Sequence, residues 1–287
     1  MLEIGISFSK KNTVESSYTM NVLKQTFSAL EDLVENAVIK ISHDGISAQV
    51  IDSMHVCLCD VRLSSELFTH FRCDTDVLLT VPLKSFNLLF KNMTVAKDGD
   101  SLMISAVEVF RKKKKDENTQ TQNDSQNKAT RLARANSLTL TNTTESAFLK
   151  TSIALLDSEA PEFMLPDTNF QNEIEISAES FRQMKNLGGL FGNKVVFKVQ
   201  KDEFVVMQKG EGTESCLILK NNENKSIVVN STMPTQLEIN KQYLDTVQKI
   251  LGLCDKMRVS MSPETPILFE MGLNEYGYIH FFIAPQA

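Results

Sequence analysis

GISAQVIDSMHVCLCDVRLSSELFTHFRCD, the stretch from Gly45 to Asp74, decides how the rest of the chain is organised. Two runs rich in β-branched and apolar residues, Ile46–Ile51 and Val56–Leu63, are separated by the polar corner Asp52-Ser53-Met54-His55. Runs of this kind predict two strands joined by a turn, and a further strand begins at Phe71. The corner has no nucleophile–base pair, phosphate-binding loop or metal-ligand spacing. The residues of the corner therefore indicate no catalytic site.

The composition is typical of a globular protein with substantial cores. The chain has 287 residues, of which 42% are hydrophobic and 23% are charged. This length suits one large domain or two of ordinary size. No apolar run approaches the roughly 20 residues of a membrane-spanning helix, and the N-terminus lacks the layout of a signal peptide. We expect no membrane partner.

Cysteine usage and charge limit the classes of site further. The five cysteines are odd in number and scattered, which favours a reducing compartment. Cys57 and Cys59 share one face of a strand without a second pair or a nearby histidine, so we expect core packing and no metal or cofactor. The net charge of −6 argues against a protein that coats nucleic acid over its whole surface, although a local basic face remains compatible with it.

Two helices are expected in the first half of the chain. In Tyr18–Ala37, apolar residues recur at four, three and four residues from Leu23, which predicts one buried helix face with Lys24 on the opposite side. A shorter helix is expected from Pro82, because proline suits a first helical turn. Its polar side carries Lys84 and Lys91.

The second half repeats this layout. Ser177 is a plausible N-cap for a helix to about Leu187, four strand candidates follow, and a second helix is expected over Lys241–Leu251. Each half thus reads as helix, strands, helix, strands. Segregated strands and helices predict α+β domains with antiparallel sheets, and their repetition indicates an internal duplication.

We place the domain boundary in a proline-containing connector. The expected organisation is an N-terminal domain over residues 1–156, a connector over 157–170, and a C-terminal domain over 171–287. Residues 111–135 are polar and charged and are expected to form an insertion between two strands of the first domain. Its basic beginning, Arg111–Lys115, is open to three interpretations: a solvated loop, a nuclear-localisation cluster or an extra phosphate contact.

Several segments, in order along the chain, carry a resemblance to one family. VLKQTFSALEDLVENA, HDGISAQVIDSMHVCL and FRCD are followed by Leu165-Pro166, SMSPETPILFEM and YIHFFIAPQA. Together they resemble the PCNA family of DNA sliding clamps over nearly the whole chain apart from the insertion. The resemblance implies two similar α+β clamp domains with antiparallel sheets outside and two helices each inside. Three such subunits would join head to tail into a closed ring.

The resemblance implies that double-stranded DNA passes through the ring along the polar helix faces. A loose, sequence-independent attraction to phosphates would let the clamp slide. One departure is Glu31, with Asp32 beside it, where family members often carry a basic residue. The candidate phosphate contacts are Lys24, Lys84, Lys91, Arg182, Lys185, Lys241 and Lys249.

A second implied site is an apolar pocket for partner proteins. Family members bind short motifs of the PIP-box type between the corner, the connector and the C-terminus, with most binding energy in a few anchors. The partners implied are DNA polymerase, the clamp loader and other proteins with such motifs. Lys201 resembles a lysine that the family uses for ubiquitin-type modification. By position, the pocket maps onto Ile51, His55, Val56, Leu165, Pro266, Phe282, Ala284 and Pro285.

The third implied site is the subunit interface. The strand Phe148–Leu156 would pair with the strand Cys216–Lys220 of the next subunit, and ring closure would satisfy both edges. The residues expected to meet there are Phe148, Leu149, Ile153, Leu217 and Ile218.

The sequence thus favours a homotrimeric clamp that tethers a polymerase to DNA, in the nucleus or in a viral replication compartment. Two alternatives keep the fold: a subunit of a heterotrimeric checkpoint clamp, or a monomeric viral processivity factor. An enzyme is disfavoured, because the four histidines show no metal spacing and neither a G-x-S-x-G nor a G-K-[ST] motif occurs.

Overall fold

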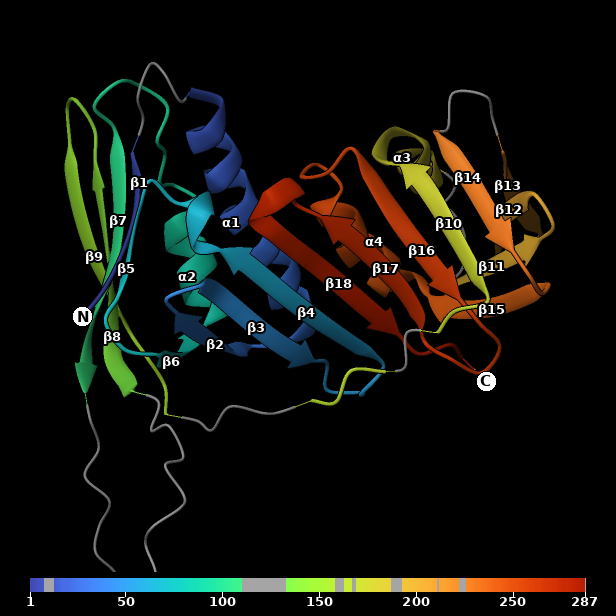
Figure 1. Cartoon of the computed structure of the whole chain (residues 1–287), viewed down its shortest axis with the longest axis horizontal. Helices are drawn as coiled ribbons and strands as arrows, with labels where there is room; N and C mark the ends of the chain where they lie inside the picture. The colour runs from blue at the N-terminus through green and yellow to red at the C-terminus, as the bar shows by residue number, and fades with distance from the viewer. Residues whose placement is uncertain are drawn as a thin grey trace, which may run out of the picture.

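The computed structural model describes residues 1–7, 13–109, 133–157, 163–166, 169–186, 193–210, 212–221 and 226–286. They form strands β1 to β18 and helices α1 to α4 (Figure 1). The helices are α1 (Thr13–Leu33), α2 (Leu83–Phe90), α3 (Ala178–Asn186) and α4 (Lys241–Ile250). In the first half the strands are β1 (Leu2–Ser7), β2 (Asn36–Ser42), β3 (Gly45–Ile51), β4 (Cys57–Ser64), β5 (His70–Cys73), β6 (Val77–Pro82), β7 (Ser101–Val109), β8 (Ala133–Thr143) and β9 (Phe148–Ala154). In the second half they are β10 (Asn172–Ser177), β11 (Lys194–Gln200), β12 (Glu203–Gly210), β13 (Thr213–Lys220), β14 (Ile227–Ser231), β15 (Thr235–Asn240), β16 (Lys256–Met261), β17 (Ile267–Gly272) and β18 (Gly277–Ile283).

The two halves have the same order of elements and the same strand pairings. In each half, one strand precedes the first helix, five strands separate the two helices, and three strands follow the second. The pairings of β1 with β5 and β7 recur as those of β10 with β14 and β16. The pairings of β2 with β3 and β6 recur as those of β11 with β12 and β15. The structure therefore contains one unit twice, and the change from one to the other falls between β9 and β10.

The elements follow from simple sequence patterns. In β2, Ala37, Ile39 and Ile41 alternate with more exposed residues, so one face of the strand packs on the core. In α4 the buried side chains recur at helical spacing, and the Asn240 side chain accepts a hydrogen bond from the Gln242 amide at 3.0 Å. The core contains aromatic pairs such as Phe27 and Phe86, whose ring centroids lie 4.5 Å apart.

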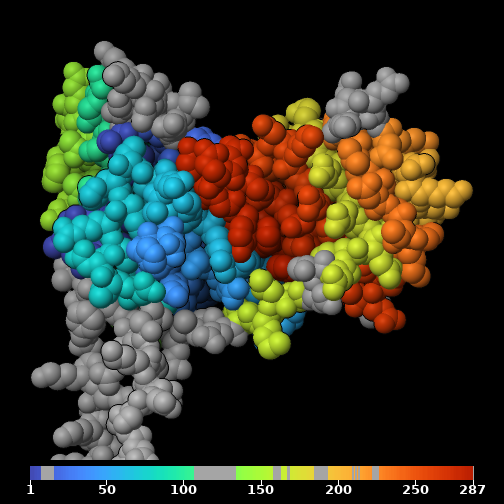
Figure 2. Space-filling view, in the orientation of Figure 1, coloured from blue at the N-terminus to red at the C-terminus, as the bar shows by residue number. Residues whose placement is uncertain are grey.

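One continuous sheet crosses from the first half into the second. Its junction is the antiparallel pair of β4 with β18, in which Asp60 faces His280. At this junction Gly277 has a φ of +128°, and a Cβ atom there would lie 2.0 Å from the Arg62 carbonyl oxygen, so only glycine fits. A separate sheet has the order β13-β12-β11-β15. Figure 1 looks onto the strands of the junction, with the helices behind them, and Figure 2 shows the two halves as adjoining surfaces.

The first helix differs from its prediction at both ends. It spans Thr13–Leu33 instead of Tyr18–Ala37. The apolar spacing from Leu23 ends at Val34, and strand β2 already begins at Asn36, so Ala37 pairs with Val81 in the sheet. At this position the period-two pattern of the strand prevails over the helical one.

Two predicted segments fall largely outside the described residues. Residues 111–132 of the insertion are among them, while Ala133–Ala135 already belong to β8. Of the predicted connector, residues 157, 163–166 and 169–170 are described, and residues 163–166 lie along the lower edge of the junction in Figure 2. Within the described ranges, no helix is long and apolar enough to cross a membrane.

Candidate functional site

The four helices lie on one side of the sheets and bring most of the predicted cations to a common face. Helix α1 packs against α2 in its own half and against α4 of the other half, and α4 also packs against α3. Six of the seven predicted cations have described side chains. The side chain of Lys185 lies outside the described residues.

Two of these cations bind the carbonyl ends of neighbouring helices. The Lys24 ammonium donates hydrogen bonds to the carbonyl oxygens of Lys91, at 3.2 Å, and Met93, at 2.7 Å, just beyond α2. Burial lowers the pKa of Lys24. Arg182 of α3 donates to the Leu251 carbonyl, at 3.3 Å, just beyond α4. Helix carbonyl ends attract cations, so both side chains stabilise helix ends.

Lys24 and Arg182 occupy equivalent positions of the repeat. Each stands twelve residues before the first residue of the strand that follows its helix, Asn36 in β2 and Lys194 in β11. Each donates to the end of the second helix of its own half. The duplicated unit has therefore kept this contact twice.

Two further cations of the set are paired with carboxylates. The Lys249 ammonium lies 2.7 Å from the Asp32 carboxylate, which also accepts a hydrogen bond from Thr246 at 3.1 Å. Lys241 pairs with Asp245 one helical turn further on, at 3.2 Å. Glu31, the departure noted in the sequence, accepts a hydrogen bond from Asn87 at 2.7 Å. The carboxylates of α1 thus join helices together and reduce the positive charge of the helix face.

Lys84 of α2 and Lys91, the residue that follows α2, are exposed cations of this face. Among the residues that the structure describes, neither forms an ion pair. They lie two helical turns apart on the same side of the helix, so both ammonium groups face the same region.

The polar corner is built around Asp52. Its carboxylate accepts hydrogen bonds from the amides of Val56 and Cys57, both at 2.7 Å, and of Met54, at 3.2 Å. The Tyr243 hydroxyl of α4 adds a fourth at 2.8 Å. Burial alone would raise the pKa of Asp52, but the hydrogen bonds outweigh it, so the pKa lies below its ordinary value. Burial, together with the hydrogen bond to Asp52, raises the pKa of Tyr243 to about 12.

An apolar cluster lies on the outer side of the sheet beside this corner. Leu58, Leu268 and Phe282 form its centre, on the adjacent strands β4, β17 and β18. Ile51 and the connector residues Phe163 and Phe170 pack against them. The cluster therefore joins both halves of the chain and the connector in one surface.

The structure brings together only part of the predicted pocket. Ile51 and Phe282 belong to the cluster, whereas Val56 packs against the main core. The Ala284 amide donates to the Val56 carbonyl at 2.8 Å, which places the C-terminal segment beside the corner. Pro266 and Pro285 are half-buried, and Leu165 is exposed. His55 is exposed and has a φ of 57°, so it serves the turn geometry.

The sequence reading missed Leu58, Leu268, Phe163 and Phe170. Two consecutive apolar residues in a strand could have indicated the residues on strands. Successive side chains of a strand point to opposite faces, so when one of the two packs on the core, the other lies on the outer face. Phe281-Phe282 and Ile267-Leu268 are such pairs, and Phe163 and Phe170 are the aromatic residues of the predicted connector.

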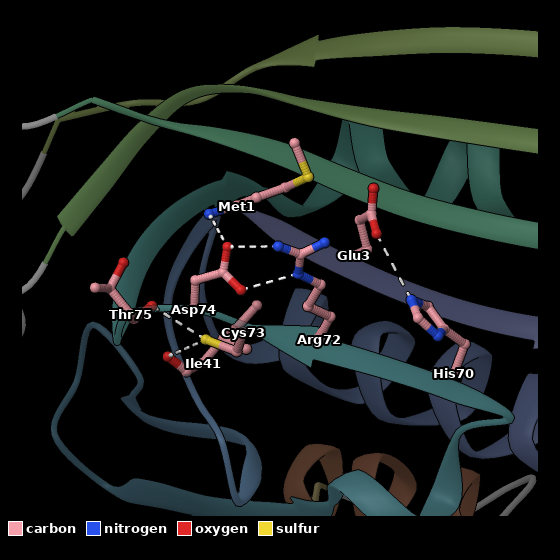
Figure 3. A network of polar contacts seen from close by, with 8 residues as sticks. All are labelled: Met1, Glu3, Ile41, His70, Arg72, Cys73, Asp74 and Thr75. Atoms are coloured by element: carbon pink, nitrogen blue, oxygen red, sulfur yellow. Dashed lines mark hydrogen bonds and ion pairs between the residues drawn. The ribbon is translucent and has the colours of Figure 1, made fainter.

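The FRCD segment has a structural role. Arg72 donates from Nε and Nη2 to the Asp74 carboxylate, at 2.9 and 3.1 Å, and the Met1 amino group lies 3.2 Å from the same carboxylate (Figure 3). The Cys73 thiol donates to the Thr75 carbonyl at 3.1 Å. The contact between Met1 and Asp74 joins the start of β1 to the end of β5, and the other contacts hold the Asp74 turn.

Five described strands pair with a single neighbouring strand: β5, β9, β13, β14 and β15. Two of them, β9 and β13, carry the predicted interface residues. Strand β9 pairs only with β8 over its length, and β13 pairs only with β12. Both edges carry exposed apolar side chains: Phe148 is 68% exposed, Leu149 48% and Ile218 51%. Of the other predicted interface residues, Leu217 is half-buried and Ile153 is buried.

Comparison with known proteins agrees with this architecture. The family model of the proliferating cell nuclear antigen N-terminal domain matches residues 15–134, and that of the C-terminal domain matches residues 164–286. The proliferating cell nuclear antigen of Chaetomium thermophilum is 22% identical over 271 residues, which cover 93% of this chain and 95% of that protein. Proliferating cell nuclear antigen 2 of Drosophila melanogaster is 22% identical over 265 residues, covering 92% and 94%.

The duplicated unit, its sheets and its helices define the DNA sliding-clamp fold, which confirms the predicted α+β class. Within that class, the chain belongs to the proliferating cell nuclear antigen family.

Proposed function

We propose that three copies of this chain form a closed ring around double-stranded DNA and tether DNA polymerase, the clamp loader and other replication or repair proteins to it. The proposal includes the division into domains over residues 1–156 and 171–287, joined by the connector. The chain itself makes or breaks no bond. Tethering raises the local concentration of a partner near its template, and that is the whole mechanism. The setting would be the nucleus, or a viral replication compartment.

One structural relation carries the ring proposal. In the duplicated unit, β9 is the counterpart of β18, and β13 is the counterpart of β4. Within the chain, β18 and β4 pair and join the two halves. Their counterparts β9 and β13 do not pair with each other within the described chain, and each has one free edge. Pairing β9 of one copy with β13 of the next would therefore repeat between chains the junction already made inside each chain. A head-to-tail contact of this kind closes a ring when the rotation from copy to copy returns to the first copy.

The same relation gives the strand register between subunits. The strand pairings of the first half can be matched residue by residue with those of the second half. This matching makes Lys150 of β9 the counterpart of His280 of β18, and Cys216 of β13 the counterpart of Asp60 of β4. His280 and Asp60 face each other across the inner junction. Lys150 of one subunit would then face Cys216 of the next. On either side of this pair, Leu149 would face Leu217 and Thr151 would face Ser215.

This register brings the exposed apolar side chains together. Leu149 and Leu217 take the places of Ile279 and Val61, which are both buried in the inner junction. Phe148 and Ile218 would meet on the outer side. Cross-strand apolar pairs stabilise antiparallel sheets, and pairing removes two edges that would otherwise favour aggregation.

The helix face would attract duplex DNA weakly. Lys84 and Lys91 are the strongest candidates for phosphate contacts, while the predicted contribution of Lys24, Arg182, Lys241 and Lys249 is reduced by the protein groups they already bind. A modest positive face suits sliding, because each phosphate contact is sequence-independent and easily exchanged.

Partner proteins would bind the outer apolar cluster. The surface combines Leu58, Leu268 and Phe282 with the connector residue Phe163. A short motif with aliphatic and aromatic anchors would add its side chains there, with the binding energy concentrated in those anchors.

The test is the molar mass in solution, measured by light scattering over a range of protein concentrations. We expect three times the chain mass for the wild type, and the chain mass for Phe148→Asp and Ile218→Asp, because each places a carboxylate in the apolar strand pair. Met233→Asp, at an exposed methionine outside the edges, is the matched control and should stay trimeric. A concentration-independent monomer for the wild type would refute the homotrimer. It would leave the two alternatives, a partner chain of different sequence or a monomeric processivity factor.

A further inference from the structure

We propose that a groove between α1 and α2 binds a small amphipathic organic anion, a molecule with an apolar body and one carboxylate, sulfate or phosphate group. The groove has a volume of about 680 Å³ and is lined by side chains of α1 and α2 with Lys249 of α4 at one wall. This volume lies in the range of small-molecule sites.

The exposed apolar surface of the groove is provided by Leu88. Phe90 is fully buried, whereas Leu88 is 69% exposed in the middle of α2. Leu83, Phe86 and Phe90 form the face of α2 that packs on the core, and Leu88 points away from it. Leu88 therefore contributes little to folding. It offers an apolar surface inside the groove that a DNA phosphate cannot use.

Three ammonium groups give the groove its charge. Lys84 and Lys91 lie four residues before and three residues after Leu88, so they flank it on the same side of the helix. Lys24 lines the opposite wall, and its hydrogen-bond acceptors are carbonyl groups rather than carboxylates. The one carboxylate of the lining, Glu31, is held by Asn87.

An apolar surface flanked by cations selects the class of ligand. The apolar body of the ligand would cover Leu88, and its acid group would bind between the Lys84 and Lys91 ammonium groups or reach Lys24. A neutral apolar molecule would leave the cations unused, and inorganic phosphate would leave Leu88 unused. The groove lies on the face that we propose for DNA, so a bound anion would compete with the duplex. The groove itself is complete within a single chain.

The experiment titrates the full chain with 1-anilinonaphthalene-8-sulfonate and, separately, with dodecyl phosphate, followed by fluorescence and calorimetry. We expect saturable binding of one molecule per chain. Leu88→Gln should weaken it at least tenfold, and Lys84→Gln with Lys91→Gln should weaken it and reduce its salt dependence. Met233→Gln and Lys40→Gln are matched controls at an exposed methionine and an exposed lysine elsewhere, and both should bind as the wild type does.

Either of two results would overturn the proposal: binding that does not saturate, or an equal loss in Leu88→Gln and Met233→Gln. Failure of the proposed ring can be distinguished from failure of the proposed anion site. Leu88→Gln changes no charge, so its molar mass and its salt-dependent duplex binding should match the wild type. A monomeric wild type that still binds one anion per chain would support the groove while refuting the homotrimer.

Discussion

The hydroxyl of Tyr243, in helix α4 of the second half, lies 2.8 Å from the carboxylate of Asp52, in the corner between β3 and β4 of the first half. Both residues are buried. Asp52 also organises the corner through three backbone amides. The contact therefore connects the helix layer of one half with the corner beside the outer apolar cluster.

Tyr243→Phe should lower the free energy of unfolding by about 1.5–3 kcal/mol, the range for a hydrogen bond to a charged group. The phenyl ring keeps the packing of Tyr243, so the loss of stability measures the contribution of the hydroxyl group. A double-mutant cycle with Asp52→Ala, which removes the acceptor, is measured by chemical denaturation and isolates the pair. An equal cost of Tyr243→Phe in the Asp52→Ala background would mean that the two side chains do not interact.

The lowered pKa of Asp52 predicts how stability depends on pH. The folded-state pKa lies below the ordinary value of 3.8, so the stability that Asp52 contributes is present above the unfolded-state pKa. It is lost as the pH falls through the folded-state pKa. Denaturation from about pH 5 to about pH 2 should therefore show a steeper acid loss in the wild type than in Asp52→Asn. Parallel pH profiles would contradict the assignment of this carboxylate as a stabilising acceptor.

Much of the fold could be predicted because one face of nearly every element is apolar. The period-two pattern of Ala37, Ile39 and Ile41 fixes β2, and the helical spacing from Leu23 fixes the buried side of α1. The outer site was harder to predict. Phe282 and Leu268 come from neighbouring strands but Phe163 comes from the connector, and only the folded sheet brings them together.

The roles of the cations could not be read from the sequence. The sequence pattern around a lysine on a polar helix face is the same whether the lysine binds a phosphate or a helix carbonyl. Lys24 binds carbonyl groups that lie 67 and 69 residues away in the sequence. Likewise, the pairing of Asp32 with Lys249 depends on how α1 and α4 pack across the two halves. Long-range geometry, absent from local patterns, decides both.

Lys24 and Lys91 should therefore respond differently to loss of charge. Lys24→Gln should lower the free energy of unfolding by about 1–2 kcal/mol, because the carbonyl end of α2 loses its cation. Lys91→Gln should leave stability nearly unchanged but weaken duplex binding and its salt dependence. Denaturation curves and salt-dependent anisotropy of a labelled duplex measure both quantities. An equal loss of stability in the two variants would contradict the assignment of Lys24 to the helix end and of Lys91 to the duplex.

Asp32→Asn should strengthen the attraction for DNA. The substitution removes the negative charge that lies 2.7 Å from the Lys249 ammonium and so leaves that cation available to a phosphate. The slope of log affinity against log salt should steepen by about 0.9, the value for one additional phosphate contact on duplex DNA. Glu175→Gln, which removes a carboxylate paired with Arg258 on a strand, is the matched control and should leave the slope unchanged. An unchanged slope in Asp32→Asn would show that Lys249 does not face the duplex.

The inferred register between subunits can be tested with a cysteine that the chain already carries. Cys216 is exposed on the free edge β13, and the register places it opposite Lys150 of the next copy. Lys150→Cys should therefore form a disulfide between subunits under mild oxidation, because facing residues of an antiparallel pair lie within the Cα separation that a disulfide needs. Denaturing electrophoresis without reductant should show a covalent trimer that reductant converts to the single chain.

Two controls make this result specific. Lys150→Cys combined with Cys216→Ser should give no cross-link. Ser152→Cys, on the same side of β9 but two residues from the inferred partner, should cross-link much more slowly, since its separation from Cys216 exceeds that of a facing pair. Equal rates for Lys150→Cys and Ser152→Cys would mean that β9 and β13 meet in another register, and the internal junction of β4 with β18 would then be no template for ring closure.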